Sequence, residues 1–396
     1  MKSIDRRGFL KAGLAGAACI ALAPAAIAAD LKSPEGEIIY RTLGKTGLRV
    51  PVISFGVMRS DNPGLCKAAY EKGIRLFDTA NGYQNGNNET MLGNVFKDIP
   101  RDSFYLATKV KAAGMTREGL PTAETTADDF LAKFSESMSR LKMDYVDILY
   151  VHDISNIEYL KYKPILNAVK KLKKDGKARF VGFSTHRNEP AVIEAASESK
   201  DWDVILTSYN FLQAYRKELD AAVKKAAAAG IGIVAMKTLA GGGFLDKEKT
   251  KPINTGAAIR WVLSNPDIHT TIPGMTQFDQ LESNARLLTD ISLTEQDKRD
   301  LMLAATEPGL FCSGCSECVG RCPKGLFIPD LMRAYMYAYG YGNTLEAQAL
   351  LAGLGYGKDP CSDCTECTVE CGRGFSIREK ITDVSRLTEV PSDFLA

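Results

Sequence analysis

The 396-residue sequence predicts an α/β protein, a (β/α)8 TIM barrel followed by a small, mainly helical domain. Two observations carry this prediction. From residue 37 onward, short β-branched or apolar runs alternate with segments of helical period, and eight such units fit a closed barrel better than an open sheet. Near the C-terminus, eight of the ten cysteines lie between Cys312 and Cys371. We therefore expect a leader over 1–29, a barrel over 37–305 and a cysteine-rich domain over 308–396.

The predicted elements follow the chain in a regular order. A small hairpin comes first, with strands over 38–41 and 48–50. The eight barrel strands are expected over 52–57, 75–79, 105–110, 146–152, 178–184, 204–209, 231–238 and 270–273. Apolar residues recur at helical spacing in six segments, which are therefore predicted to be helices. Four lie in the barrel, at 127–141, 165–175, 217–229 and 256–264, and two lie beyond it, at 328–339 and 345–354. No Gly-x-Gly-x-x-Gly follows the first barrel strand, which argues against an open dinucleotide-binding sheet.

The first 29 residues have the pattern of an export signal. A basic start precedes a weakly apolar run over 12–23, and the small residues of 24–29 offer a cleavage site near Ala28 or Ala29. The run RRGFLK at 6–11 resembles the twin-arginine (Tat) motif. The apolar run is too short, and too interrupted by glycine, to span a membrane. We expect export by the Tat machinery, with no membrane span in the mature chain and a periplasmic or other extracytoplasmic location. The alternative is a cytoplasmic protein without a cleaved leader.

Composition narrows the function classes. Charged residues make up 25% of the chain and the net charge is +2, so a nucleic-acid binder built on a basic face is disfavoured. The hydrophobic share of 45% is that of a globular protein with a full core.

Four titratable residues mark one rim of the predicted barrel. Asp78 ends the second barrel strand and Tyr83 lies in the loop that follows it. Lys109 ends the third strand and His152 ends the fourth. Any one of them alone would be read as packing or a helix cap. Barrel enzymes place their chemistry at the C-terminal ends of the strands, so four such residues from consecutive strands form a candidate catalytic group.

The segments around these residues resemble the aldo-keto reductases. The matching segments are FDTANGY at 77–83, ATK at 107–109 and DILYVH at 147–152, supported by YRTLGKTG at 40–47, SRL at 139–141, DYVD at 144–147, GKAR at 176–179 and IPG at 272–274. The resemblance covers about residues 37–290. It implies carbonyl/alcohol interconversion with Tyr83 as general acid and His152 orienting the substrate oxygen. Lys109, kept charged by Asp78, is expected to lower the pKa of Tyr83 from its usual value near ~10.

The same resemblance implies a nicotinamide cofactor, NADP or NAD, lying across the barrel mouth. The positions that match its contacts are Gly56, Met58, Ser184, Met236, Lys237, Leu239, Gly241, Gly274, Gln280 and Asn284. Met236 stands where an aromatic residue often stacks on the nicotinamide. Gly274 and Gln280 stand where basic residues commonly hold a 2′-phosphate, and losing an arginine there removes a charge-assisted contact that Lys237 could only partly replace. The choice between NADP and NAD, and tight nucleotide binding itself, are left open.

The cysteines form two runs of one spacing. The metal-ligating candidates are Cys312, Cys315, Cys318 and Cys322, followed by Pro323, and then Cys361, Cys364, Cys367 and Cys371. This is the bacterial ferredoxin pattern, in which the fourth cysteine ligates the partner cluster, and it predicts two 4Fe–4S clusters. A single cluster, zinc or four disulfides are the alternatives. Of the other cysteines, Cys19 lies in the leader and Cys66 is expected in the core.

Together the two domains predict an exported oxidoreductase. Its substrate is a small carbonyl or alcohol, and electrons pass through the two clusters to or from a redox partner. The tyrosines at 335, 337, 339 and 341 are expected to cover the clusters and dock the small domain, rather than to relay electrons. The alternative function is an electron-transfer or accessory iron–sulfur protein that uses the barrel as a docking scaffold.

Overall fold

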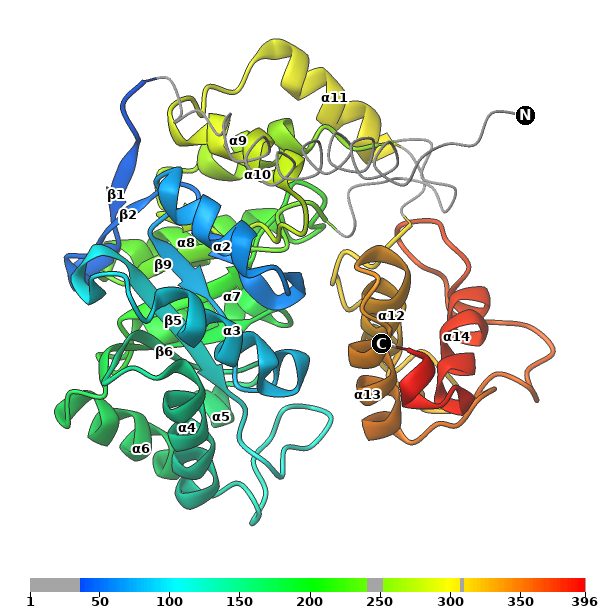
Figure 1. Cartoon of the computed structure of the whole chain (residues 1–396). Coiled ribbons are helices and arrows are strands. Elements are labelled where there is room, and N and C mark those ends of the chain that lie inside the picture. The colour runs from blue at the N-terminus through cyan, green and yellow to red at the C-terminus, as the bar shows by residue number, and fades with distance from the viewer. Residues whose placement is uncertain (1–35, 241–251, 307–309, 396) are drawn as a thin grey trace, which may run out of the picture.

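The computed structural model describes residues 36–240, 252–306 and 310–395 (Figure 1). The predicted leader and Gly241 lie outside these ranges. Within them the chain forms a strand barrel surrounded by helices, and a second, helical unit stands beside it, with α12, α13 and α14 at the right of Figure 1.

Eight parallel strands form the barrel, as predicted. They are β3 (Phe55–Gly56), β4 (Leu76–Asp78), β5 (Tyr105–Val110), β6 (Val146–Val151), β7 (Ala178–Thr185), β8 (Val204–Ser208), β9 (Gly232–Met236) and β10 (Thr270–Thr271). Each pairs with the next in chain order. Parallel bridges join Ile53 to Thr271 and Gly56 to Gly274, and these bring the last strand against the first. The predicted hairpin precedes the barrel as β1 (Tyr40–Thr42) and β2 (Arg49–Pro51).

Helices cover the outside of the barrel. They are α2 (Pro63–Glu71), α3 (Asn87–Phe96), α4 (Ala127–Leu141), α5 (Ile157–Leu160), α6 (Lys163–Lys174), α7 (Glu189–Ser197), α8 (Arg216–Ala228), α9 (Thr255–Leu263), α10 (Phe278–Ala285) and α11 (Glu295–Thr306). Short 3-10 turns occur at Gly44–Thr46, Val57–Arg59, Tyr83–Gly86, Arg101–Ser103, Arg286–Leu288, Arg386–Glu389 and Ser392–Phe394.

Helix α4 illustrates why these segments are helical. The Thr126 side chain accepts a hydrogen bond from the backbone N–H of Asp129, which caps the first turn. Phe130, Phe134 and Leu141 recur at helical spacing and are buried against the strands. The apolar stripe therefore sets which face of the helix packs on the barrel.

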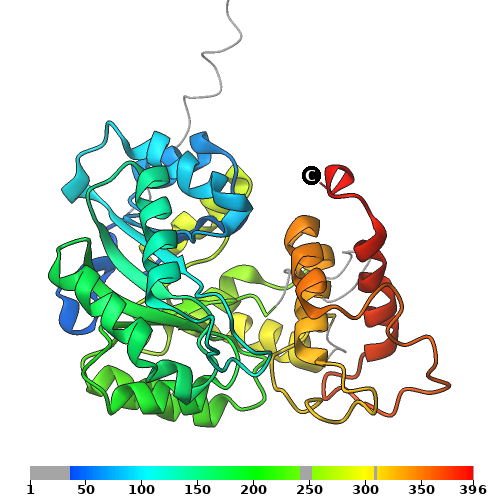
Figure 2. The ribbon, with the colours of Figure 1, turned by 90° about the horizontal axis from the view of Figure 1, so that it is seen from below.

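The C-terminal unit has a hydrophobic core of its own. It contains α12 (Ile328–Tyr335), a π-helical turn (η6, Met336–Gly340), α13 (Thr344–Leu354) and α14 (Ile377–Ser385), seen from below in Figure 2. Leu331, Ala347 and Val384 are fully buried in it. The predicted helix over 328–339 is present, although its last part widens into the π turn.

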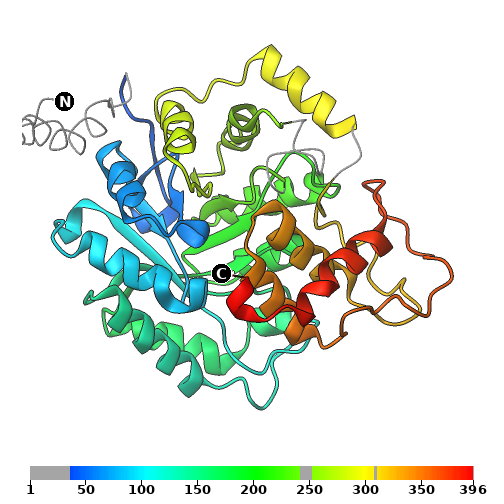
Figure 3. The same cartoon turned by 45° about the vertical axis from the view of Figure 1, so that its right-hand side comes forward.

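The C-terminal unit docks on the loops after the barrel strands, and Figure 3 shows its orange and red helices in front of the barrel. Arg117, in the loop after β5, donates hydrogen bonds to the Tyr356 hydroxyl and to the Leu354 carbonyl, both at 2.6 Å. Arg333 of α12 lies 3.6 Å from the carboxylate of Asp153 in the loop after β6. The second domain thus contacts the rim where a barrel carries its chemistry. None of the described helices combines the length and apolar character that a membrane crossing requires.

Candidate active site

The four predicted catalytic residues come together because their strands are neighbours. Asp78 is the last residue of β4, Lys109 lies near the end of β5, and His152 follows β6 directly. Tyr83 begins the 3-10 turn after β4. Parallel pairing of β4 with β5 and of β5 with β6 puts these strand ends on one rim.

A buried ion pair lies at the base of the site. Lys109 and Asp78 are 1% and 3% exposed, and the Lys109 ammonium donates a hydrogen bond to the Asp78 carboxylate. It donates a second bond, of 2.7 Å, to the Thr79 carbonyl. Burial lowers the pKa of Lys109 and raises the pKa of Asp78, while their attraction opposes both shifts. Each residue therefore provides the counter-charge that the other needs in the interior.

Tyr83 lies above this pair. The Lys109 Nζ atom is 4.8 Å from the centroid of the Tyr83 ring. The His152 ring faces the Tyr83 ring edge-on, with centroids 5.9 Å apart and planes at 82°. The two residues after Tyr83, Gln84 and Asn85, have φ of 50° and 53°, a left-handed conformation that is costly outside glycine. Gln84 donates a 3.2 Å bond to the Met58 carbonyl, which helps to hold this strained turn.

The pKa of Tyr83 differs from the sequence-based expectation. We expected Lys109 to lower it, but burial raises it well above the usual value, and the Asp78 carboxylate and Glu346 of the second domain raise it further. The expectation was wrong because burial is the largest cause of the shift and the neighbouring carboxylates add to it. Tyr83 therefore keeps its proton and is available as a donor.

His152 is a neutral imidazole in this environment. Burial and the neighbouring Lys109 lower its pKa to about 3. An imidazole that carries no charge at neutral pH can position a substrate oxygen by a hydrogen bond without competing for the Tyr83 proton.

All four residues open into one cavity of about 480 Å³. Ligand pockets typically fall between roughly 300 and 1,000 Å³. Of the ten predicted nucleotide positions, those that line this cavity are Gly56, Met58, Ser184, Met236, Lys237, Leu239, Gly274, Gln280 and Asn284. Gly241 lies outside the described residues. Asp279 and Ser283 flank Gln280 and Asn284 in the wall, so this stretch of α10 presents no basic side chain to the cavity.

Other lining residues were missed by the sequence reasoning. Arg59 lies in the wall next to the predicted Met58, so its place in the chain was a usable signal. Tyr337 and Tyr341 come from the second domain, and the Arg59 guanidinium lies 5.5 Å from the Tyr341 ring centroid. Tyr341 thus contacts the barrel through Arg59, and both tyrosines face the catalytic cavity.

Comparison with protein families identifies both parts of the chain. A model of the Aldo/keto reductase family matches residues 57–257. The chain belongs to the aldo/keto reductase family. The reductase barrel is followed by a second match, to the 4Fe-4S dicluster domain, over residues 311–376. The molecule is thus an oxidoreductase whose barrel carries an iron–sulfur domain.

Named relatives share the reductase portion. L-galactose dehydrogenase of Arabidopsis thaliana is 27% identical over 303 residues, which cover 67% of this chain and 92% of the relative. L-glyceraldehyde 3-phosphate reductase of Escherichia coli O157:H7 is 24% identical and covers 67% of this chain and 93% of the relative. Among solved structures, an aldo-keto reductase from Bacillus halodurans in its holo form is similar in fold, with a TM-score of 0.55 and 21% identity. That match covers 70% of this chain and 100% of the other.

The cysteines of the second domain sort into two groups of four. Each described cysteine is a free thiol in the structure. The match to the 4Fe-4S dicluster domain favours iron–sulfur ligation over the disulfide alternative. Burial raises the pKa of Cys312 to about 11, and the charges of Cys315 and Cys371 raise it further. Burial likewise raises the pKa of Cys361, with a further rise from Cys364, Cys367 and Cys322. Thiols influence each other in this way only when they lie close together. Cys371 is thus a neighbour of the first run and Cys322 a neighbour of Cys361, which is the pairing that crossed ligation requires.

Such groups fit iron–sulfur ligation. Thiols that raise one another's pKa are poor thiolates alone, and a cationic iron site reverses this shift by stabilising the thiolate form. Among the described residues, no three His, Cys, Asp or Glu side chains are grouped to hold a single metal ion. Cys66, by contrast, is fully buried in α2, and burial raises the pKa of its thiol to about 12, as expected of a core cysteine.

Proposed function

We propose that this protein interconverts a small carbonyl compound and its alcohol at Tyr83, Lys109, Asp78 and His152, with electrons passing through two 4Fe–4S clusters. One observation carries the proposal: these four side chains line a single cavity large enough for a small molecule. A proton donor, a paired cation and a neutral imidazole are the groups that carbonyl reduction needs.

Each residue has a distinct task. His152 donates a hydrogen bond to the substrate oxygen and fixes its position beside Tyr83. Tyr83 then gives its proton to that oxygen as negative charge develops on it. Lys109 stabilises the resulting phenolate across the 4.8 Å separation between its Nζ atom and the ring centroid. Asp78 keeps Lys109 charged and oriented, since without it the buried ammonium would favour the neutral form.

A nicotinamide cofactor would supply a hydride when bound, and the family generally uses NADP(H). The hydride and the Tyr83 proton together complete the two-electron reduction of the carbonyl. Two clusters that each change by one electron would exchange that electron pair with the nucleotide, not with the carbonyl directly. Gly56, Ser184, Met236, Gln280 and Asn284 are the residues that would hold the nucleotide, because they line the cavity beside Tyr83 and His152.

A Tyr83→Phe variant tests the catalytic assignment. It should lose carbonyl reduction while its nucleotide affinity, measured by titration calorimetry, stays unchanged. Tyr40→Phe is the matched control, because Tyr40 lies in β1, away from the cavity. Both proteins are purified anaerobically with iron and sulfide counted on the same sample. Wild-type turnover in the Tyr83 variant would remove this residue from catalysis.

Coupling between the two domains has a separate test. NADPH or NADH is added to the anaerobic protein and the visible absorbance of the clusters is followed. Bleaching indicates that hydride electrons reach the clusters. A protein with intact clusters that binds nucleotide and does not bleach would separate the clusters from the reductase reaction. It would favour the electron-transfer scaffold instead, although an open cavity lined by the complete tetrad supports an enzyme.

We also propose export by the Tat pathway to an extracytoplasmic site. The twin-arginine run and the following apolar segment support this, and so does the need to fold and load clusters before transport. Replacing Arg6 and Arg7 by lysine should keep the precursor in the cytoplasm. Mass spectrometry of the wild-type protein should find an N-terminus near residue 29, and an intact Met1 in the wild type would contradict the proposal.

A further inference from the structure

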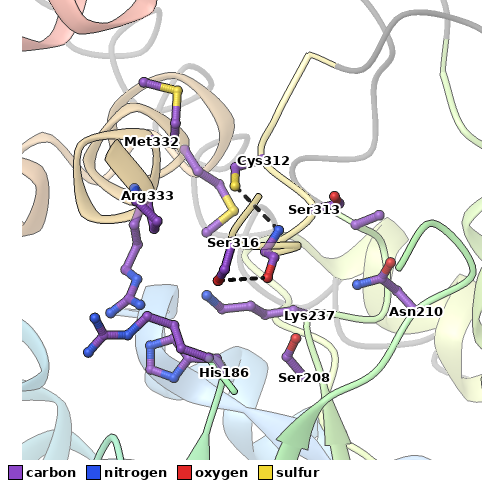
Figure 4. A pocket seen from close by; sticks show the side chains of 14 residues that line it. His186, Ser208, Asn210, Lys237, Cys312, Ser313, Ser316, Met332 and Arg333 are labelled. Atoms are coloured by element: carbon purple, nitrogen blue, oxygen red, sulfur yellow. Dashed lines mark hydrogen bonds between the residues drawn. The ribbon is translucent and has the colours of Figure 1, made fainter. Parts of the chain in front are cut away.

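A second, smaller pocket of about 50 Å³ lies between the barrel and the iron–sulfur domain (Figure 4). Its walls include His186 and Lys237 from the barrel and Cys312, Ser316 and Arg333 from the other domain. Figure 4 shows the Lys237 side chain reaching out from the strand end and lying between His186 and Ser316, with Cys312 above it. The first cysteine run therefore faces the barrel directly.

Lys237 separates this pocket from the catalytic cavity. It lines both spaces, and so does His186. Lys237 follows β9 and has a φ of 56°, a left-handed backbone conformation that a lysine adopts only when its surroundings hold it there. The backbone thus directs this side chain away from the continuing strand and toward the interface.

Most other charged side chains at the interface lie near a side chain of opposite charge. Asp153 lies near His186, Arg187 and Arg333, at 3.4, 3.9 and 3.6 Å. Asp330 lies near Arg187 and Arg333, at 3.7 and 3.4 Å. Lys237 forms none of these short contacts, although the charges of Asp153 and Glu189 act on it. Burial holds the pKa of His186 well below its usual value, so this imidazole is neutral.

Lys237 and the first cysteine group influence each other electrostatically. The side chains of Lys237 and Cys312 line the same small pocket. Burial, with the nearby Arg333, lowers the pKa of Lys237 to about 7. The negative charges of Asp153, Glu189 and Cys312 oppose that shift, so an anion at the first cysteine group favours the charged ammonium. The second group has a different neighbour, Lys324, whose side chain is 30% exposed and pairs with the exposed Asp363. Water and salt screen an exposed charge such as that of Lys324. A charge at a covered interface acts on its neighbours more strongly, because the dielectric constant there is lower.

We propose that Lys237 raises the reduction potential of the cluster held by Cys312, Cys315, Cys318 and Cys371, and so makes it the electron-accepting site next to the catalytic cavity. This rests on the proposed presence of both clusters. Reduction adds one negative charge to a cluster, and a nearby cation stabilises the reduced form more than the oxidised form. Net charge and burial around a cluster are among the factors that set its potential. In this role Lys237 acts through its charge on the cluster, apart from its place in the wall of the catalytic cavity.

The test is an anaerobic redox titration of the full chain, followed by the electron paramagnetic resonance signals of the reduced clusters. Lys237→Gln should lower one midpoint potential and leave the other in place. A tenfold fall in the equilibrium constant for one-electron reduction corresponds to about 59 mV. Lys237→Arg keeps the charge and should restore the wild-type potential. Lys324→Gln is the matched control at the second cluster and should leave the first potential unchanged.

Two further variants keep the test decisive. Cys364→Ser disturbs the second group, so the signal that persists identifies the first cluster. Ser313→Asp adds a negative charge to the same pocket, and should lower the same potential even if the Lys237→Gln protein fails to load its clusters. Equal shifts of both potentials, or no shift, would overturn the proposal. Because the titration uses dithionite and mediators and no carbonyl substrate, its outcome is independent of the Tyr83 test.

Discussion

Removing the positive charge of Lys109 should destabilise the barrel strongly. In Lys109→Met the Asp78 carboxylate would remain buried, at 3% exposure, without its counter-ion, and the Thr79 carbonyl would lose a 2.7 Å bond. Breaking a buried ion pair from one side costs about 3–5 kcal/mol, because an uncompensated charge stays in the interior. For domains of 150–250 residues this corresponds to a fall in Tm of roughly 6–20 °C, and this larger barrel should lie toward the lower end.

Thermal unfolding of the anaerobic protein, followed by circular dichroism, measures the effect. Lys111→Met is the matched control, because its side chain is 59% exposed and its pairing with Asp153 is long, at 3.4 Å. The Asp153 carboxylate is only 8% exposed, but it keeps Arg187 and Arg333 as partners when Lys111 is replaced. The buried Asp153 charge is not left unpaired, so the Tm should change little. The double variant Lys109→Met with Asp78→Asn removes both charges and should recover much of the loss. A Lys109→Met protein as stable as the Lys111 control would refute the reasoning.

Two further predictions concern proton and metal binding. The pKa of His152 is lowered to about 3 in the folded protein, below its unfolded value near ~6.5. The folded state is therefore not penalised by His152 above pH ~6.5, and it loses stability as the pH falls below ~6.5 toward the folded pKa, because the unfolded chain binds the proton first. Between pH 6.5 and 5, His152→Gln should flatten the pH dependence of unfolding free energy by up to about 1.4 kcal/mol per pH unit, and an unchanged slope would refute this. The crossed cysteine groups predict that Cys371→Ser disturbs the cluster of the first run and Cys322→Ser that of the second, as measured by iron content and electron paramagnetic resonance. Loss of the first-run cluster in Cys322→Ser would show uncrossed ligation.

Much of the barrel was readable from the sequence, since alternating apolar runs and helical periods are local signals. The strand over Tyr105–Val110 and the helix over Ala127–Leu141 match the prediction residue by residue. The shortest strands were predicted to be longer than they are. The first barrel strand was predicted over 52–57, whereas β3 covers only Phe55–Gly56. Strand ends depend on pairing with β4 and β10, which no local pattern encodes.

The sequence by itself determined which residue types stand at the strand ends and how the cysteines are spaced. Consecutive parallel strands must end on one rim, so Asp78, Tyr83, Lys109 and His152 could be grouped before their distances were known. Cysteine spacing likewise sufficed to predict two four-thiol sites, because ligation by one cluster constrains near neighbours along the chain.

Only the tertiary structure decided what the second domain does to the first. It places Tyr337 and Tyr341 in the wall of the catalytic cavity and brings Cys312 to the pocket that Lys237 lines. It also reverses the expected direction of the Tyr83 pKa shift, because burial raises this pKa and the carboxylates of Asp78 and Glu346 raise it further. The burial of a side chain and the electrostatic potential around it depend on residues that are far apart in the chain. Both are fixed only when the two domains pack together.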